Sequence, residues 1–262
     1  MQIHFYKFHG AGNDFILIDQ RREAVALSEQ QIAFLCHRRF GIGADGLMLL
    51  ENSGDYDFRM RYYNSDGREG SMCGNGGRCI VAFADFLGIK KTEYIFEAVD
   101  GLHRAKILES GDAKWEVELQ MLDVEQVEQR DNHFFLDTGS PHHVEYVADV
   151  QKVDVVQRGK NIRYSEEYAP SGTNVNFISE QNGQILIRTY ERGVEDETLA
   201  CGTGVTAAAI AVALSKGDMR NEYVIKALGG DLKVRFERKE QRFTNLWLTG
   251  PAAFVFAGEI NL

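Results

Sequence analysis

The strongest constraint on the fold is a short cysteine-glycine sequence that occurs twice. Residues 73–76 read CGNG, and residues 201–204 read CGTG, about half a chain length later. The flanks agree, because Tyr62 falls opposite Tyr190 at the same offset. At an offset longer by one residue, three upstream residues also have counterparts, namely Phe5, Gly10 and Asn13 opposite Phe134, Gly139 and His142. A duplicated unit is the simplest interpretation, and its period is too long for a solenoid.

The length of the chain accommodates two such units. With 262 residues, of which 44% are hydrophobic, the chain can form two cores of ordinary size. A polar stretch at residues 123–131 marks the boundary. We therefore predict an N-terminal domain over residues 1–123, carrying Cys73, and a C-terminal domain over residues 124–262, carrying Cys201, whose last strand is free to return to the N-terminal half. The alternative is one continuous domain with an accidental repeat.

Charge and cysteine usage narrow the class of protein. The formal net charge is −10, and the Lys and Arg residues are scattered, which argues against nucleic acid or a membrane surface as a partner. The longest apolar stretch, residues 205–214, is mostly alanine and too short to cross a bilayer. The four cysteines form no CxxC pair, and no basic segment followed by an apolar core opens the chain. These features predict a cytoplasmic protein with reduced thiols.

The hydrophobic pattern predicts an α+β fold. Ser28 and Gln31 form a capping box for a helix over residues 29–38. Each cysteine turn precedes a segment that is apolar on nearly every side, residues 77–87 and 205–215, as expected for a fully enclosed helix. Alternating or β-branched runs predict strands at residues 3–8, 47–51, 58–63, 102–108, 115–119, 175–178, 185–190 and 232–236. We expect two pseudo-symmetric domains, each a mainly antiparallel sheet or barrel around a central helix.

Some motifs are better explained by structure than by function. Residues 41–46 match GxGxxG, but they follow a predicted helix and precede a strand, the reverse of a dinucleotide-binding unit, so we predict a tight turn. We assign Cys36 and Cys79 to the core. His142 and His143 could approach the cysteines, yet no CxxC or HxxxH spacing supports a zinc site, and we predict no metal.

The two cysteine turns carry chemistry. A thiol placed where a strand leads into a helix lies near unpaired N–H groups and the positive end of the helix dipole, which favour the thiolate. The same N–H groups, those of residues 74–76 and 202–204, would bind a carboxylate. If the two halves face each other, one carboxylate would be held from both sides. The pair Glu191-Arg192 falls opposite Tyr63-Asn64 at the offset of the cysteines, and this placement favours a position along a cleft.

The chain resembles the diaminopimelate epimerases over essentially its whole length. The resemblance is carried by eight segments, residues 8–15 (FHGAGNDF), 41–46, 63–67 (YNSDG), 72–79 (MCGNGGRC), 140–142 (SPH), 173–177 (TNVNF), 190–193 (YERG) and 197–204 (ETLACGTG). Members of this family interconvert LL- and meso-2,6-diaminopimelate without pyridoxal phosphate or a metal, on the route to lysine and peptidoglycan precursors. The resemblance therefore implies an isomerase without a cofactor and with a small-molecule substrate, and it implies a homodimer.

The resemblance also implies roles for individual residues. Cys73 and Cys201 would act on opposite faces of the substrate α-carbon, one as base and the other as acid. Helix N-termini at Gly74, Asn75, Gly202 and Thr203 would stabilise the charge that develops on the carboxylate. Asn13 would lie beside the reacting centre, with His142 and Glu191 as polar neighbours. The distal amino-acid end would be held by a further three residues, Asn64, Asn174 and Arg192.

Two residues depart from the pattern of the family. Many members carry Gln at the position of Gly46, so a side-chain contact to substrate would be missing or supplied elsewhere. Many members also have Asn where this chain has Ser140, which keeps the ability to donate and accept hydrogen bonds but has a shorter reach. Both departures leave the thiols untouched and bear on substrate affinity.

Two other functions fit part of the sequence. A proline racemase-like enzyme would share the two-thiol layout, but that group typically has His where this chain has Asn75, and proline has no second end to pair with Glu191 and Arg192. A thiol redox or ligand-binding protein would instead join Cys73 and Cys201 in a disulfide. Turnover of diaminopimelate or of free proline distinguishes the first alternative, and activity of the reduced protein distinguishes the second.

Overall fold

The chain divides into two compact units. The computed structural model describes residues 1–22, 25–217 and 220–262. Unit 1 comprises Met1–Leu119 and Gly250–Leu262, and unit 2 comprises Gln120–Thr249. The end of the chain thus belongs to the first unit, a return that the sequence left open. That residues 1–123 and 124–262 form separate domains stays a prediction.

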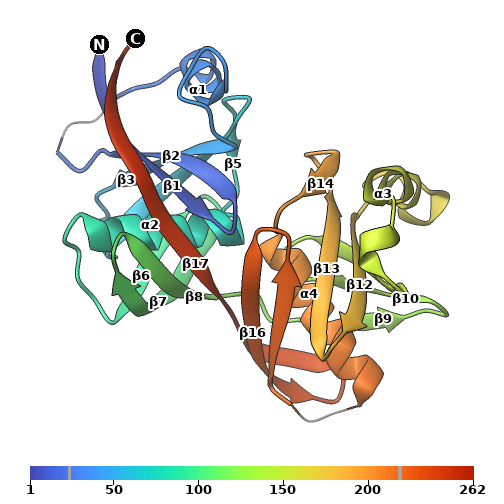
Figure 1. Cartoon of the computed structure of the whole chain (residues 1–262). Helices are drawn as coiled ribbons and strands as arrows, with labels where there is room; N and C mark the ends of the chain where they lie inside the picture. The colour runs from blue at the N-terminus through green and yellow to red at the C-terminus, as the bar shows by residue number, and fades with distance from the viewer. Residues whose placement is uncertain (23–24, 218–219) are drawn as a thin grey trace. The chain divides into compact units, whose positions relative to one another are not determined.

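Unit 1 is a strongly curved sheet wrapped around one helix (Figure 1). The enclosed helix is α2 (Gly74–Phe86), whereas α1 (Glu29–Cys36) packs on the outer face. The last strand pairs with both β1 and β8, so the sheet closes on itself. Its strands are β1 (Gln2–Gly10), β2 (Asn13–Asp19), β3 (Gly46–Glu51), β4 (Phe58–Asn64), β5 (Glu69–Gly70), β6 (Glu93–Ala98), β7 (Gly101–Gly111), β8 (Lys114–Gln120) and the second part of β17 (Arg242–Asn261).

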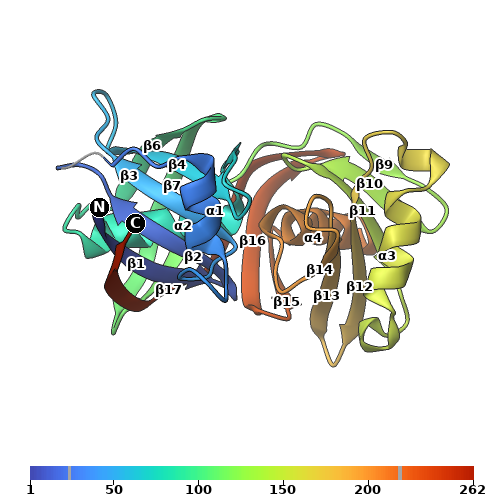
Figure 2. The same cartoon turned by 90° about the horizontal axis from the view of Figure 1, so that it is seen from above.

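Unit 2 repeats this plan, with α4 (Gly202–Lys216) enclosed by strands and α3 (Val155–Arg163) on the outside (Figure 2). Two short 3₁₀ helices flank α3, η1 (Val150–Lys152) and η2 (Glu166–Tyr168). Its strands are β9 (Val127–Gln129), β10 (His133–Asp137), β11 (Pro141–Tyr146), β12 (Asn174–Gln181), β13 (Gln184–Glu191), β14 (Asp196–Thr198), β15 (Glu222–Ala227), β16 (Gly230–Lys239) and the first part of β17.

The pairing of the strands confirms the predicted pseudo-symmetric α+β fold. In unit 1, β1 and β2 are antiparallel, β2 and β3 are parallel across the α1 crossover, and β3 and β4 are antiparallel. In unit 2, the same relations join β10 to β11, β11 to β12 across α3, and β12 to β13. After the central helix, a parallel pairing follows in both units, β4 with β6 and β13 with β15. The order of parts is therefore duplicated.

The register of these strands corrects the residue equivalences predicted upstream of the cysteines. Tyr63 packs in the cluster beneath α1, and Tyr190 packs in the cluster beneath α3. Tyr63 pairs with Leu47 on β3, and Tyr190 pairs with Val175 on β12. The counterpart of Tyr190 is thus Tyr63 rather than Tyr62, because unit 2 has one more residue between this strand and its cysteine. A shift of one residue exchanges the two faces of a strand.

The same register defines a set of counterparts on the inner face of each sheet. Phe15 pairs with Gly46 across β2 and β3, as His142 pairs with Asn174 across β11 and β12. Continuing this register along the strands gives six inner-face pairs, each with the residue of unit 1 first and its counterpart in unit 2 second. The pairs are Asn13 with Ser140, Phe15 with His142, Gly46 with Asn174, Met48 with Asn176, Tyr62 with Thr189, and Asn64 with Glu191. The upstream equivalence of Asn13 with His142 is therefore also wrong.

Several local predictions are confirmed. The Ser28 side chain accepts from the Gln31 N–H, and Gln31 bonds back to the Ser28 N–H, which completes the capping box. Asn182 and Gly183, both at positive φ, form the two-residue turn between β12 and β13. The GxGxxG segment is the turn between α1 and β3.

The central helices start earlier than predicted. They begin at Gly74 and Gly202, so Cys73 and Cys201 are the N-cap residues themselves. The glycines after each cysteine, which predict a loop, form the first helical turn instead. Among the described residues, no helix combines the length and the apolar character needed to cross a membrane.

Candidate active site

The thiol of unit 1 lies at the N-terminus of the enclosed helix α2. Cys73 is half-buried, and its Sγ accepts a hydrogen bond from the Gly76 N–H at 3.2 Å. A β-carbon at position 76 would lie 3.2 Å from that sulfur and 3.3 Å from the Met48 sulfur, so the thiol packs closely against the first turn. A backbone donor of this kind stabilises negative charge on the sulfur.

Two asparagines stand beside this thiol. The buried Asn75 donates from Nδ2 to Asn13 Oδ1 at 3.2 Å, and Asn13 donates from Nδ2 to Asp45 at 2.6 Å. Arg78 is fully buried and donates to Asn75 Oδ1 at 2.8 Å and to the Gly74 carbonyl at 3.0 Å. Burial lowers the pKa of Arg78 to about 10, so its guanidinium remains charged at neutral pH. These contacts determine the orientation of both asparagine amides.

A cluster of charged residues holds this arrangement from behind. Arg38 donates to Asp14 at 3.1 and 2.6 Å and to Asp45 at 2.6 Å, and Lys7 forms an ion pair with Asp14 at 2.7 Å. Burial acts to raise the pKa of Asp14, but the hydrogen bonds from Arg38 and Lys7 outweigh it and hold the pKa at about 2. Because Arg38 bonds to Asp45 as well as to Asp14, it also holds Asp45 where this carboxylate orients Asn13.

The inner face of β4 leads from the core of unit 1 toward its surface. Met60 is buried, Tyr62 is half-buried and Asn64 is exposed. Asn64 is the register partner of Gly46, where the family pattern led us to expect a missing side chain. The space above Gly46 is filled, since a β-carbon there would lie 2.5 Å from Tyr62 Cε2 and 2.9 Å from its hydroxyl oxygen.

The thiol of unit 2 ends a chain of hydrogen bonds that begins in the core. The buried Asn176 donates from Nδ2 to the backbone carbonyl of His143 at 2.9 Å, which determines which end of its amide carries hydrogen. The same Nδ2 lies 3.0 Å from His142 Nδ1, so this ring nitrogen must accept. In a neutral imidazole, Nε2 then carries the proton and donates to Ser140 Oγ at 3.0 Å.

The direction of the remaining bonds follows from the first. Ser140 Oγ also accepts from Asn174 Nδ2 at 3.2 Å, so the Ser140 hydroxyl proton points to Thr203 Oγ1 at 3.3 Å. The Thr203 hydroxyl is thereby left to donate to Cys201 Sγ at 3.4 Å. A chain of donors running from Asn176 through His142, Ser140 and Thr203 thus ends on the Cys201 sulfur and favours negative charge there.

Neutral His142 is required for this direction. The pKa of His142 is lowered to about 3, first by complete burial and then by the positive charge of Arg192, although the hydrogen bond with Asn176 acts in the opposite direction. Protonation at Nδ1 would also place two donors face to face. The imidazole is therefore uncharged throughout the physiological pH range.

The other predicted residues of unit 2 lie beside this chain. Asn174 accepts at Oδ1 from the Arg192 backbone N–H at 2.8 Å, and its Nδ2 donates to the Pro141 carbonyl at 3.1 Å. Glu191 accepts from the Thr198 hydroxyl at 2.9 Å. Arg192 and Glu191 are half-buried, so both side chains remain accessible to a ligand.

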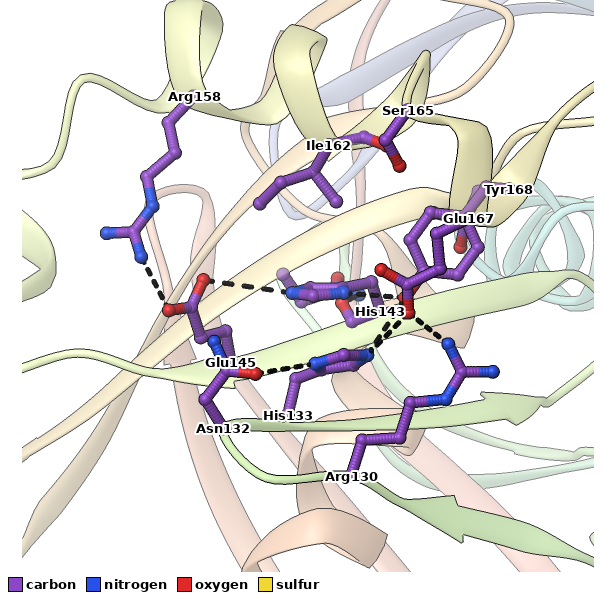
Figure 3. Close-up of polar contacts among 12 residues, drawn as sticks. Arg130, Asn132, His133, His143, Glu145, Arg158, Ile162, Ser165, Glu167 and Tyr168 are labelled. Atoms are coloured by element: carbon purple, nitrogen blue, oxygen red, sulfur yellow. Dashed lines mark hydrogen bonds and ion pairs between the residues drawn. The ribbon is translucent and has the colours of Figure 1, made fainter.

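The remaining histidine and cysteines lie elsewhere. His143 follows His142 on β11 and points to the opposite face, where its ring stacks on His133 at 4.1 Å between centroids and bonds to Tyr168 (Figure 3). It therefore does not join His142 and a cysteine. Cys36 and Cys79 are buried, and burial raises the pKa of both thiols, that of Cys36 to about 12.

The structure groups the predicted residues of each unit and adds others. In unit 1, Asn13 bonds to Asn75 in the first helical turn after Cys73, and Asn64 lies at the end of β4. In unit 2, His142 and Asn174 bond to Ser140, which bonds to Thr203, and Asn174 also bonds to the backbone of Arg192. Sequence reasoning gave no role to four residues that connect them, Asp45, Arg78, Asn176 and Thr189. The alternation of Asn174 and Asn176 along one strand was the available signal, because polar residues at period two share a face.

We expect Gly204→Ala to disrupt the hydrogen-bond chain. A β-carbon at position 204 would lie 2.4 Å from Asn176 Oδ1, which also accepts from Thr189 at 3.0 Å in a fully buried setting. We expect a loss of about 1–3 kcal/mol in the free energy of unfolding, because buried hydrogen bonds must break. Urea unfolding measures this, with Gly54→Ala as control, since nothing lies within 4 Å of a β-carbon there. Equal losses in both variants would contradict the assigned packing.

Sequence comparison finds relatives over nearly the whole length of the chain. A sequence model of the family described as diaminopimelate epimerase matches residues 5–125 and 134–255. A diaminopimelate epimerase of Flavobacterium psychrophilum is 51% identical over 253 residues, covering 96% of this chain and 97% of the relative. One from Chlorobaculum tepidum is 46% identical over 265 residues, covering 97% of this chain and 99% of the relative.

Solved structures share the fold at low sequence identity. A phenazine biosynthesis protein of the PhzF family from Bacillus anthracis has a TM-score of 0.80 at 14% identity, with both chains covered completely. A hydroxyproline epimerase from Agrobacterium vitis has a TM-score of 0.69 at 15% identity, covering 100% of this chain and 93% of the other. These likenesses concern the fold alone.

Proposed function

The chain belongs to the diaminopimelate epimerase family, and from this premise we propose that it interconverts LL- and meso-2,6-diaminopimelate by moving one α-proton. The enzyme is an isomerase, and its reaction serves lysine and peptidoglycan precursor synthesis. The observation that best supports the proposal is that each unit presents one cysteine as the N-cap of its enclosed helix.

In the proposed reaction, the two thiols exchange roles. One cysteine, as thiolate, removes the α-proton, and the electron pair of the C–H bond passes into the adjacent carboxylate. The other cysteine, as thiol, delivers its proton to the opposite face of the carbon. The thiolate has become a thiol and the thiol a thiolate, so the reverse reaction starts from the product state. Both cysteines act in each direction, one as base and the other as acid, so two groups of similar acidity are needed.

The carboxylate is stabilised by the helix N-termini. In unit 1 the Gly76 N–H is already bonded to the Cys73 sulfur, so we assign the carboxylate to the backbone N–H groups of Gly74 and Asn75. Gly202 and Thr203 supply the same groups in unit 2. Helix N-termini favour developing negative charge.

The hydrogen-bond chain that ends on Cys201 prepares this thiol for catalysis. Neutral His142 orients Ser140, and Ser140 orients Thr203, whose hydroxyl stabilises the thiolate form of Cys201. Ser140 thus performs an orienting role despite its shorter side chain. In unit 1 the corresponding stabilisation comes from the Gly76 N–H.

The distal amino-acid end is recognised by polar groups at the strand ends. We assign its carboxylate to Arg192 and its amino group to Glu191, with Asn64 and Asn174 as further contacts. Arg192 can form two parallel hydrogen bonds to a carboxylate. Recognition of this end selects which of the two stereocentres reaches the thiols. Free proline lacks such an end, which favours diaminopimelate over a proline racemase reaction.

Purified protein kept reduced is expected to convert LL-diaminopimelate into the meso form without an added cofactor. The conversion is followed by chiral chromatography of the products at equilibrium. Turnover of free proline without turnover of diaminopimelate would contradict the proposal and favour the racemase alternative. Full activity after oxidation to a Cys73–Cys201 disulfide would contradict the role of the thiols.

We also propose a cytoplasmic location and a homodimeric state. All four cysteines are free thiols, as expected in a reducing compartment. Dimerisation is implied by the family resemblance, and sedimentation equilibrium of the reduced protein tests it.

A further inference from the structure

The inner face of unit 1 contains a tyrosine that the proposed mechanism does not use. The Tyr62 ring lies between two glycines: a β-carbon at Gly46 would lie 2.5 Å from its Cε2, and one at Gly70 would lie 3.2 Å from both Cδ1 and Cε1. The buried Phe15 packs against it, with 6.2 Å between ring centroids. Glycine at position 46 is therefore required for this ring to occupy its place, and the ring also packs closely against Gly70.

The ring borders Asn64, the exposed residue at the end of the same strand. Residues 62 and 64 share the inner face of β4, and the Asn64 amide nitrogen would lie 2.8 Å from the same β-carbon at Gly70 that the Tyr62 ring approaches. Tyr62 is half-buried, whereas Met48 and Met60, farther along this face, are buried. The ring therefore lies where the face becomes accessible, next to a residue assigned to the substrate.

The counterparts of Gly46 and Tyr62 in unit 2 indicate what the Tyr62 hydroxyl does. In unit 2 the counterpart of Gly46 is Asn174, whose amide bonds to Ser140 and to the Arg192 backbone. The counterpart of Tyr62 is the smaller Thr189. In unit 1 the Tyr62 hydroxyl reaches over Gly46, 2.9 Å from the place of a β-carbon. At this position unit 2 thus has the side chain of Asn174, on β12. Unit 1 instead has the hydroxyl group of Tyr62, which reaches the corresponding place from β4.

We propose that Tyr62 is a substrate-binding residue whose hydroxyl donates a hydrogen bond to the carboxylate of the distal amino-acid end, beside Asn64. The inference rests on the proposed function, since it assigns a contact within the same site. A phenol hydroxyl donates one hydrogen bond, and a bond to a charged acceptor is among the stronger ones. Tyr62 therefore supplies from β4 the side-chain contact that glycine at position 46 removes.

The test compares Tyr62→Phe with Tyr63→Phe. The first substitution removes only the hydroxyl and retains the ring, while the second removes a hydroxyl from the adjacent residue on the opposite face, within the cluster under α1. We expect the KM for LL-diaminopimelate to rise about tenfold in Tyr62→Phe, with kcat changed less than about twofold, because the contact is made equally before and during proton transfer. Tyr63→Phe should leave both constants unchanged.

Calorimetric titration with diaminopimelate separates this inference from the proposed function. If the unmodified protein turns over substrate and Tyr62→Phe has an unchanged KM, the inference is wrong and the proposed function stands. If the unmodified protein binds diaminopimelate without turning it over, the proposed reaction is wrong, and a Kd about tenfold weaker in Tyr62→Phe still supports the contact. If the unmodified protein does not bind diaminopimelate, both are wrong.

Discussion

Alanine in place of either Cys73 or Cys201 is expected to lower the rate of epimerisation by about 10² to 10⁴-fold, the usual contribution of a general acid or base. Each thiol starts the enclosed helix of one unit, so neither can replace the other on its own face of the α-carbon. Chiral chromatography of product formed from LL- and from meso-diaminopimelate measures the loss. Circular dichroism should show an unchanged fold, since the substitution removes one sulfur atom.

Exchange of the substrate α-hydrogen in heavy water shows which stereoisomer each variant can still deprotonate. A variant that retains the base for one stereoisomer should exchange the α-hydrogen of that isomer for deuterium without inverting it. The complementary variant should do so with the other isomer. Cys36→Ala is the matched control, because this thiol is buried under α1 and burial raises its pKa to about 12. Full epimerase activity in either Cys73→Ala or Cys201→Ala would eliminate the two-base mechanism.

The sequence predicts the duplicated plan because the determinants are local. Capping at Ser28, the two-residue turn at Asn182 and Gly183, and the two apolar helices each depend on neighbouring residues, and all three are confirmed. The repeated cysteine turns also lead correctly to the two enclosed helices. What they do not indicate is that each helix begins at the cysteine. Glycine is a poor helix former, but here the close approach of neighbouring atoms to Gly76 and Gly204 leaves little room for a side chain.

The predictions that are wrong or missing concern features that depend on packing between segments distant in the sequence. One additional residue between β13 and Cys201 shifts the counterparts of Tyr62 and Tyr63, and only the strand register reveals which tyrosine faces inward. Helix α3 was not predicted, since its segment is largely polar and contains Gly159. That glycine is required because a β-carbon there would lie 2.4 Å from Tyr190. Connecting residues such as Asn176 were missed for a similar reason, as a hydrogen-bond chain has no signature in spacing.

The free energy of unfolding is expected to decrease as the pH is lowered below about 6.5, because His142 is buried in its neutral form. An unfolded histidine takes up its proton near pH 6.5, whereas buried His142 has a pKa lowered to about 3. Between these values the unfolded state binds one more proton than the folded state. The free energy of unfolding is therefore at its full value above pH 6.5 and decreases by up to about 1.4 kcal/mol for each unit of pH below it.

Urea unfolding at several pH values between 5 and 7.5 tests this expectation. Lowered carboxyl pKa values, such as that of Asp14, contribute their own loss mainly at more acidic pH, around and below the usual carboxyl pKa. His133 has a pKa lowered by burial and adds a slope of the same sign, so the measured quantity is the difference between variants. The free energy of unfolding of His142→Gln, whose side chain cannot titrate, should fall less steeply with decreasing pH than that of the unmodified protein.

The same property makes a prediction for catalysis. Since His142 remains neutral between pH 8 and pH 5, the direction of hydrogen bonding toward Cys201 does not reverse over this range. The pH dependence of kcat/KM should therefore report the thiols rather than the imidazole. An imidazole resonance of His142 that titrates near pH 6.5 in the nuclear magnetic resonance spectrum would contradict both expectations, because a charged ring would remove the acceptor for Asn176 and break the chain at its second residue.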